Sequence, residues 1–123
     1  MEKVKLNSKG INKKIKANIL DDTTMKAIGF TNFYEPNWFF SRRLNLPGKH
    51  IEISFNVSIP KDGSDISIDI LDDDFCQPYD YQYMLEEHPS FELAKMVKEQ
   101  VEDWMEYLTQ KGVLEGHIRG EYI

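Results

Sequence analysis

Three consecutive carboxylates, Asp72, Asp73 and Asp74, form the densest group of side chains in the sequence that could perform chemistry. They follow an expected strand, a position where metal-dependent nucleases and phosphotransferases often place carboxylates, and such oxygens suit hard cations. No register of the segment matches the EF-hand pattern, because it lacks a glycine at the sixth position and a glutamate at the twelfth. A metal-dependent hydrolase at Asp72–Asp74 therefore stays open as an alternative, but we favour a hydrated acidic loop that ends the strand.

The histidines and the single cysteine form no metal or nucleophile motif. His50, His88 and His117 lie far apart beside loop signals, so a zinc ion would need ligands from distant segments. Cys76 has acidic neighbours, which disfavour the reactive thiolate, and we expect it to pack beside Phe75. No P-loop, no GxGxxG and no GxSxG motif is present. We therefore expect no catalytic residue, metal ligand or cofactor, and a non-enzymatic role.

Aromatic and basic side chains gather in the segment from Trp38 to Arg43. Aromatic residues beside arginines can stack on the bases of single-stranded nucleic acid. Adjacent strand residues point to opposite faces, so Phe39 and Phe40 cannot both lie in the core of one sheet. An aromatic patch left exposed usually marks an interface. The tyrosines at 79–83 could likewise be buried in the core or exposed as a contact surface. The candidate interaction surface comprises Trp38, Phe39, Phe40, Arg42, Arg43, Tyr79, Tyr81 and Tyr83.

A β-hairpin is the clearest element that could position these residues. Residues 51–59 alternate strictly between apolar and polar side chains, and residues 65–71 repeat the alternation after a turn at 60–64. The aromatic segment 37–44, bounded by Pro36 and Pro47, adds a third antiparallel strand. Residues 113–123 alternate loosely, so they could add an edge strand or pair with a partner.

Helices are expected at three places. Residues 91–111 carry an apolar stripe at helical spacing, with Ser90 as the N-cap and Gly112 just beyond the end. The stripe consists of Leu93, Val97, Val101, Trp104 and Leu108. A shorter helix of about two turns ends at Gly29, and residues 79–87 are either helical or extended. The fold class is thus α+β: an antiparallel three- to four-stranded β-meander packed against a long C-terminal amphipathic helix, with one or two short helices.

Charge is unevenly divided along the 123 residues, a length typical of a single domain. Residues 1–18 hold six lysines and one glutamate, whereas residues 19–123 hold nine basic and twenty acidic side chains. We expect a basic, partly disordered N-terminal arm at 1–18 and one α+β domain at 19–123. The arm could bind nucleic acid, but the negative field of the domain opposes this, and we favour a solubilising role.

The absence of a signal-peptide pattern and of membrane-length apolar segments predicts a cytosolic protein with no membrane partner. Twelve lysines against three arginines are typical of an AT-rich bacterial or phage genome. The leading hypothesis is a small, non-catalytic binding or regulatory protein whose partner is another protein or a second copy in a homodimer. An acidic inhibitor of a nucleic-acid-binding protein is one version of this hypothesis. The alternative is nucleic-acid binding through the lysine-rich arm with Arg42 and Arg43.

Overall fold

The computed structural model describes residues 15–32, 37–62 and 65–119, and predictions for residues 1–14 lie outside them. Four antiparallel strands form a sheet in the order β2-β3-β4-β5, and a separate ribbon pairs β1 with β6. The strands are β1 (Lys16–Ala17), β2 (Asn37–Arg43), β3 (Ile53–Pro60), β4 (Ser67–Asp72), β5 (Gln77–Pro78) and β6 (Leu114–Glu115). The helices are α2 (Asp22–Ile28), α3 (Tyr81–Glu87) and α4 (Glu92–Gln110). The predicted α+β class, with a meander and a long C-terminal helix, is confirmed.

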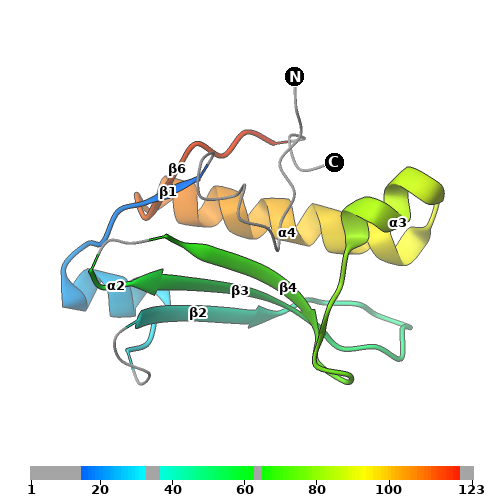
Figure 1. Cartoon of the computed structure of the whole chain (residues 1–123), viewed down its shortest axis with the longest axis horizontal. Helices are drawn as coiled ribbons and strands as arrows, with labels where there is room; N and C mark the ends of the chain where they lie inside the picture. Colours follow the sequence, from blue (N-terminus) through cyan, green and yellow to red (C-terminus); the bar gives the residue numbers. More distant parts are fainter. Residues whose placement is uncertain (1–14, 33–36, 63–64, 120–123) are drawn as a thin grey trace.

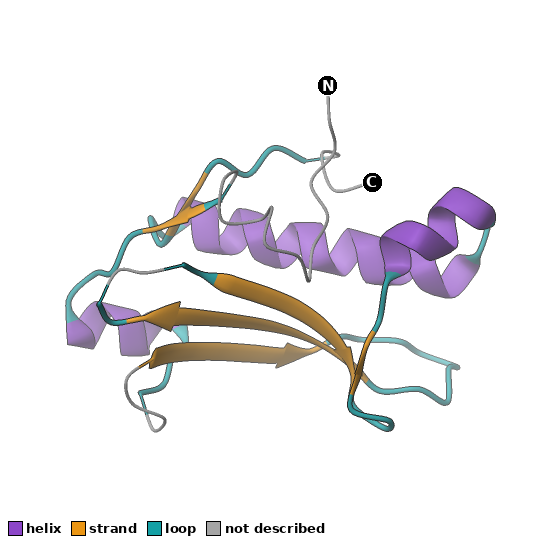
Figure 2. Ribbon diagram, viewed as in Figure 1, coloured by secondary structure: helices purple, strands orange, loops and turns teal. Residues whose placement is uncertain are grey.

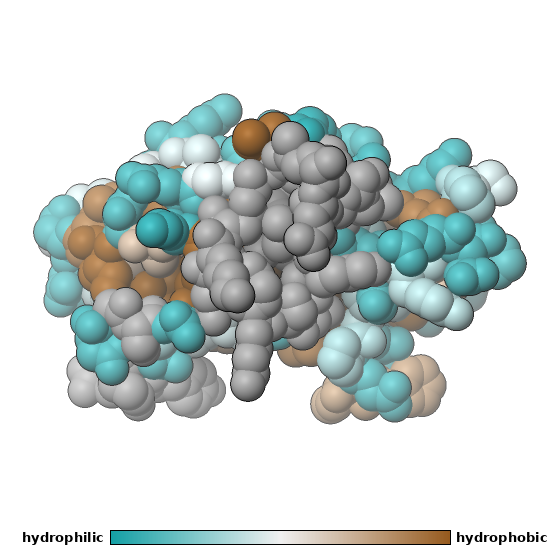
Figure 3. Space-filling model, turned by 45° about the horizontal axis from the view of Figure 1, so that its top comes forward, coloured by the Kyte–Doolittle hydropathy of each residue, from teal (hydrophilic) through white to brown (hydrophobic). Residues whose placement is uncertain are grey.

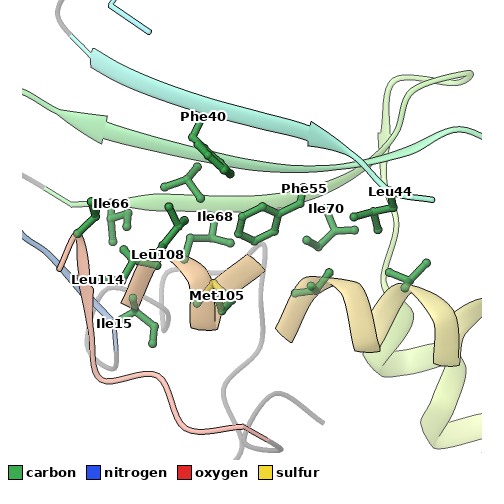
Figure 4. Packing of buried hydrophobic residues seen from close by; sticks show 14 of the residues in the cluster. Ile15, Phe40, Leu44, Phe55, Ile66, Ile68, Ile70, Met105, Leu108 and Leu114 are labelled. Atoms are coloured by element: carbon green, nitrogen blue, oxygen red, sulfur yellow. The ribbon is translucent and has the colours of Figure 1, made fainter. Parts of the chain in front are cut away.

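The described helices lie on one side of the sheet (Figures 1 and 2). Alternate side chains of β2, β3 and β4 point toward α4, and among them Phe40, Phe55 and Ile70 are fully buried. Figure 4 shows these strand side chains meeting Met105 and Leu108 of α4. The hydrophobic core is therefore the layer between the sheet and α4.

The β1–β6 ribbon packs against α4 as well. Ile15 and Leu114 are almost completely buried and lie beside Leu108 and Met105 (Figure 4). The backbone N–H of Asn18 donates to the carbonyl of Val113 at 2.7 Å, which extends the short pairing of Lys16 with Glu115. The C-terminal segment thus forms a strand, but it pairs with β1 and does not extend the four-stranded sheet.

Helix ends follow local capping rules with one exception. Asp21 caps α2 by accepting hydrogen bonds from Thr24, and these bonds lower the pKa of the Asp21 carboxyl. Ser90 is not the N-cap of α4: that position belongs to Phe91, whose side chain makes no capping bond. The reason is a tight turn in which the Phe91 N–H donates to the His88 carbonyl, so the helix begins one residue later.

The segment 79–87 contains both of the expected conformations. Tyr79 is extended and its N–H donates to the Ile70 carbonyl, which prolongs the pairing of β4 with β5. Asp80 then caps α3 by accepting from the Tyr83 N–H at 2.9 Å. The switch from strand to helix therefore falls at Asp80.

Candidate functional site

The side of the sheet that faces away from α4 is covered by no described helix (Figures 1 and 2). Strand register places its side chains in three rows: Phe39–Ser58–Ser67, Ser41–Asn56–Asp69 and Arg43–Ser54–Leu71. We call these nine residues, with Asn37, the open sheet face. Small neutral side chains predominate on it, and Phe39 and Leu71 occupy diagonally opposite corners.

The polar side chains of the open sheet face bond to one another. Ser41 donates to Asn56 at 2.6 Å, Asn56 donates to Ser54 at 3.0 Å, and Ser54 donates to Asp73 at 2.8 Å. This chain crosses the middle of the sheet, where Ser54 and Asn56 are only 5% and 7% exposed. Two further bonds join Asn37 to Ser58 and Ser67 to Asp69. These groups therefore keep hydrogen-bond partners when water is removed from the face.

The structure divides the predicted interaction residues between core and surface. Trp38, Phe40 and Tyr81 are each no more than 2% exposed, so they belong to the core and cannot serve as contact residues. Phe39 is half-buried on the open sheet face, and Tyr83 on α3 is 54% exposed. The expectation that Phe39 and Phe40 take opposite faces is thus confirmed.

The two arginines of β2 make different contacts within the chain. The Arg42 guanidinium lies 4.3 Å from the centre of the Phe40 ring and 5.6 Å from that of Trp104, on the side of the sheet that carries α4. Arg43 lies on the open sheet face, and its Nη1 is 3.5 Å from Oε1 of Glu52. Neither arginine stands beside an exposed aromatic ring in the manner expected for stacking on bases.

Tyr79 is half-buried at the edge of the core. Burial raises the pKa of its phenol, and the negative charge of Asp72 raises it further. The hydroxyl is buried and has no hydrogen-bond partner among the described residues. The hydroxyl is therefore shielded from solvent without a compensating hydrogen bond, and its surroundings indicate no role in binding a partner.

The aspartates of the β4–β5 turn hold the backbone of the turn in place. Asp72 accepts from the N–H groups of residues 74 and 75, Asp73 accepts from Ser54, and Asp74 accepts from the Glu52 N–H at 3.2 Å. Each carboxylate thus has a structural partner. Across the described ranges, no three His, Cys, Asp or Glu side chains are placed to hold a metal ion.

The tip of the same turn departs from the prediction. Cys76 is exposed with a positive φ of 54°, and Phe75 is 72% exposed, so neither packs into the core. The reason is that the turn projects from the end of the sheet, below it in Figure 1, whereas α4 lies above. Phe75 is consequently a large apolar side chain presented to solvent.

A cluster on α4 was not anticipated from the sequence. Arg119 donates to Glu99, Glu106 and Asp103 at 2.8, 2.9 and 3.1 Å, and its Nε is 3.7 Å from Glu102. Bonding to Glu106 is the main reason that the pKa of Arg119 is raised. The carboxylates recur at helical spacing and were visible in the sequence, but nothing in the loosely patterned tail indicated their partner. Figure 3 shows that most of the described surface on this side is hydrophilic.

Other features of the described part of the chain add no reactive centre. A depression of about 300 Å³ is lined by Lys26, Phe30, Thr31 and Asn32, a set without an acid–base pair. No described helix is both long and apolar enough to cross a membrane.

Comparisons with known proteins support the fold but indicate no function. The architecture is a two-layer α+β fold in which an antiparallel sheet packs on one long helix. It is similar to the crystal structure of a DUF1831 family protein from Lactobacillus plantarum, with a TM-score of 0.64 over 92% of this chain and 93% of that one. The sequences are 12% identical, so the likeness concerns the fold alone. No protein-family model and no curated protein matches the sequence.

Proposed function

We propose that the protein is a non-catalytic binding module that contacts another protein chain through the open sheet face. The proposal rests on one observation: the polar side chains of this face already hydrogen-bond to one another. Covering a polar surface usually breaks bonds to water at a cost, and that cost is small when each buried group keeps a partner.

Charge also favours this face over the α4 side. The middle of the face, Ser54 and Asn56, is uncharged, and the charged side chains Arg43, Glu52, Asp69 and Asp73 lie around it. The α4 side instead carries the four carboxylates around Arg119. Protein interfaces are depleted of charged residues at their centre, so the open sheet face is the better match.

Site-specific photo-crosslinking in the native host tests the proposal. A benzophenone amino acid replaces Phe39 on the open sheet face or, as matched controls, the exposed aromatic residues Tyr83 and Phe91. We expect the probe at position 39 to give a defined crosslinked protein that the control positions do not give. The captured protein, purified, should lose at least tenfold of its affinity for Ser58→Lys and keep its affinity for Lys95→Glu on α4.

Two results would contradict the proposal. One is an identical crosslinking pattern at all three positions, and the other is equal binding by Ser58→Lys and the parent chain. Nucleic-acid binding through residues 1–18 remains a prediction, because most of that arm lies outside the described residues. Salt-dependent DNA or RNA binding that disappears on deletion of the arm would favour it.

A further inference from the structure

We infer that residues 116–119, the part of the tail that follows β6, form a strap that opens and closes over α4 as a unit. The strap lies on the far side of α4 from the sheet (Figure 1), and the inference does not depend on the proposed function. The structure shows the closed state, in which the Arg119 side chain donates to Glu99, Asp103 and Glu106. In the open state these three carboxylates lose the guanidinium, so the strap changes the charge that this side of α4 presents to solvent.

The tail is attached in two different ways, and the change falls at Gly116. Before it, Val113 and Leu114 are 0% and 1% exposed and belong to the hydrophobic core. After it, His117 is half-buried and Ile118 is 56% exposed, so opening the strap would return little apolar surface to water. Gly116 itself has a φ of 97°, a backbone conformation that glycine adopts readily. A glycine between a packed and a largely exposed segment is suited to act as the hinge.

Closure of the strap is mainly electrostatic. Glu99, Glu102, Asp103 and Glu106 include pairs three and four positions apart on α4, a spacing at which like charges repel. The Nε of Arg119 lies 3.7 Å from Glu102, and its terminal nitrogens contact the other three carboxylates at 2.8, 2.9 and 3.1 Å. Because Glu99 and Asp103 are 63% and 66% exposed, dissolved salt screens these contacts. Closure should therefore weaken as the ionic strength rises, whereas the apolar attachment of β6 should not.

Limited digestion of the full chain by trypsin tests the inference, because trypsin cleaves after an arginine only when the guanidinium can enter its acidic specificity pocket. We expect cleavage after Arg119 to accelerate as sodium chloride rises from about 0.01 M to about 1 M, which shortens the screening length from about 30 Å to about 3 Å. A synthetic peptide of residues 113–123 lacks α4 and corrects for the effect of salt on the protease. Cleavage after Arg43, inside β2, reports unfolding of the whole domain and should stay slow throughout.

Carboxylate variants identify the groups that close the strap. A chain with Glu99→Gln and Asp103→Asn loses two exposed charged partners of Arg119, and at low salt it should be cleaved after Arg119 about fivefold faster than the parent. Its cleavage should also depend less on salt than that of the parent. Glu92→Gln is the matched control, because it removes an exposed carboxylate of α4 whose partner is Lys49. This control should be cleaved like the parent.

A distance measurement keeps the test independent of the protease. Spin labels on Ile118→Cys and Lys95→Cys, in a chain with Cys76→Ser, should give two distance populations, of which the longer grows with salt. A single distance at every salt concentration overturns the inference. So does cleavage after Arg119 that, relative to the peptide, does not change with salt, or that rises only together with cleavage after Arg43.

Discussion

Tyr79 is a residue whose burial costs the folded state free energy that no hydrogen bond returns. Its ring packs against the core, while its hydroxyl is buried without a hydrogen-bond partner among the described residues. A buried hydroxyl that has lost its water and gained no partner destabilises the folded state by roughly 1–3 kcal/mol. We expect Tyr79→Phe to raise the free energy of unfolding at neutral pH by about 1 kcal/mol, measured by urea denaturation.

The same residue gives the stability a dependence on alkaline pH. The pKa of Tyr79 is raised in the folded state by burial and by Asp72, so the folded chain holds the phenolic proton more tightly than the unfolded chain. The associated stability is complete below the ordinary tyrosine pKa of 10.0 and is lost as the pH rises through the raised value. Tyr79→Phe should reduce this alkaline loss, and Tyr83→Phe, which alters an exposed tyrosine, should not. Equal alkaline losses in the parent and Tyr79→Phe would contradict the assignment.

At the scale of elements, the end of α2 depends on a glycine that touches β2. Gly29 has a φ of 127°, and a Cβ there would overlap Nη2 of Arg42 and lie 3.1 Å from Cε2 of Phe40. Gly29→Ala should therefore lower the free energy of unfolding by about 2 kcal/mol, from the strained backbone and from displacement of Arg42. Chemical denaturation measures the loss.

A double-mutant cycle separates these two causes. Gly48→Ala is the matched control, because Gly48 also has a positive φ, 77°, but a Cβ there meets no atom within 4 Å. It should cost only the backbone strain, about 1 kcal/mol. In an Arg42→Ala background the penalty of Gly29→Ala should fall toward that of Gly48→Ala. An unchanged penalty would mean that Arg42 is not the obstructing group.

The sequence predicted elements whose pattern repeats and missed those fixed by distant contacts. Strict alternation located β3 and β4, because one face of each strand is buried and every second residue is therefore apolar. The β1–β6 ribbon has two-residue strands, too short for any periodicity, and it joins Lys16 to Glu115 across nearly the whole chain. Alternation showed that Phe39 and Phe40 face opposite sides, but only the packing of α4 decides that Phe40 is the buried one.

The candidate site was predictable to a similar, limited extent. The serine and asparagine residues of β3 were expected to face away from the core, and they do. The hydrogen bond between Ser41 and Asn56 could not be predicted, because these residues meet only when β2 and β3 adopt one register. The sequence analysis selected aromatic residues as the candidate surface. The face is composed mainly of serine and asparagine, and no motif in the sequence distinguishes these residues from other polar positions.

Across the whole molecule, Arg119 is the basic side chain that joins four carboxylates of α4 into one cluster. It forms contacts of 4 Å or less with Glu99, Glu102, Asp103 and Glu106, so it offsets repulsion among carboxylates on one helix. Arg119 also connects the tail beyond β6 to α4. Removing its charge should therefore weaken both the helix and the attachment of the tail.

We expect Arg119→Gln to lower the midpoint of thermal unfolding at low ionic strength, with a loss of stability of about 1 kcal/mol. The difference from the parent should shrink as sodium chloride is added, because salt screens the repulsion left among exposed Glu99 and Asp103. Arg119→Lys should retain part of the effect, since an ammonium group supplies charge without the planar fork that reaches several carboxylates. Arg43→Gln is the matched control, because it breaks a single exposed pair with Glu52 and should change the midpoint little. A salt-independent loss in Arg119→Gln would show that packing of the tail, and not electrostatic attraction, holds Arg119 on α4.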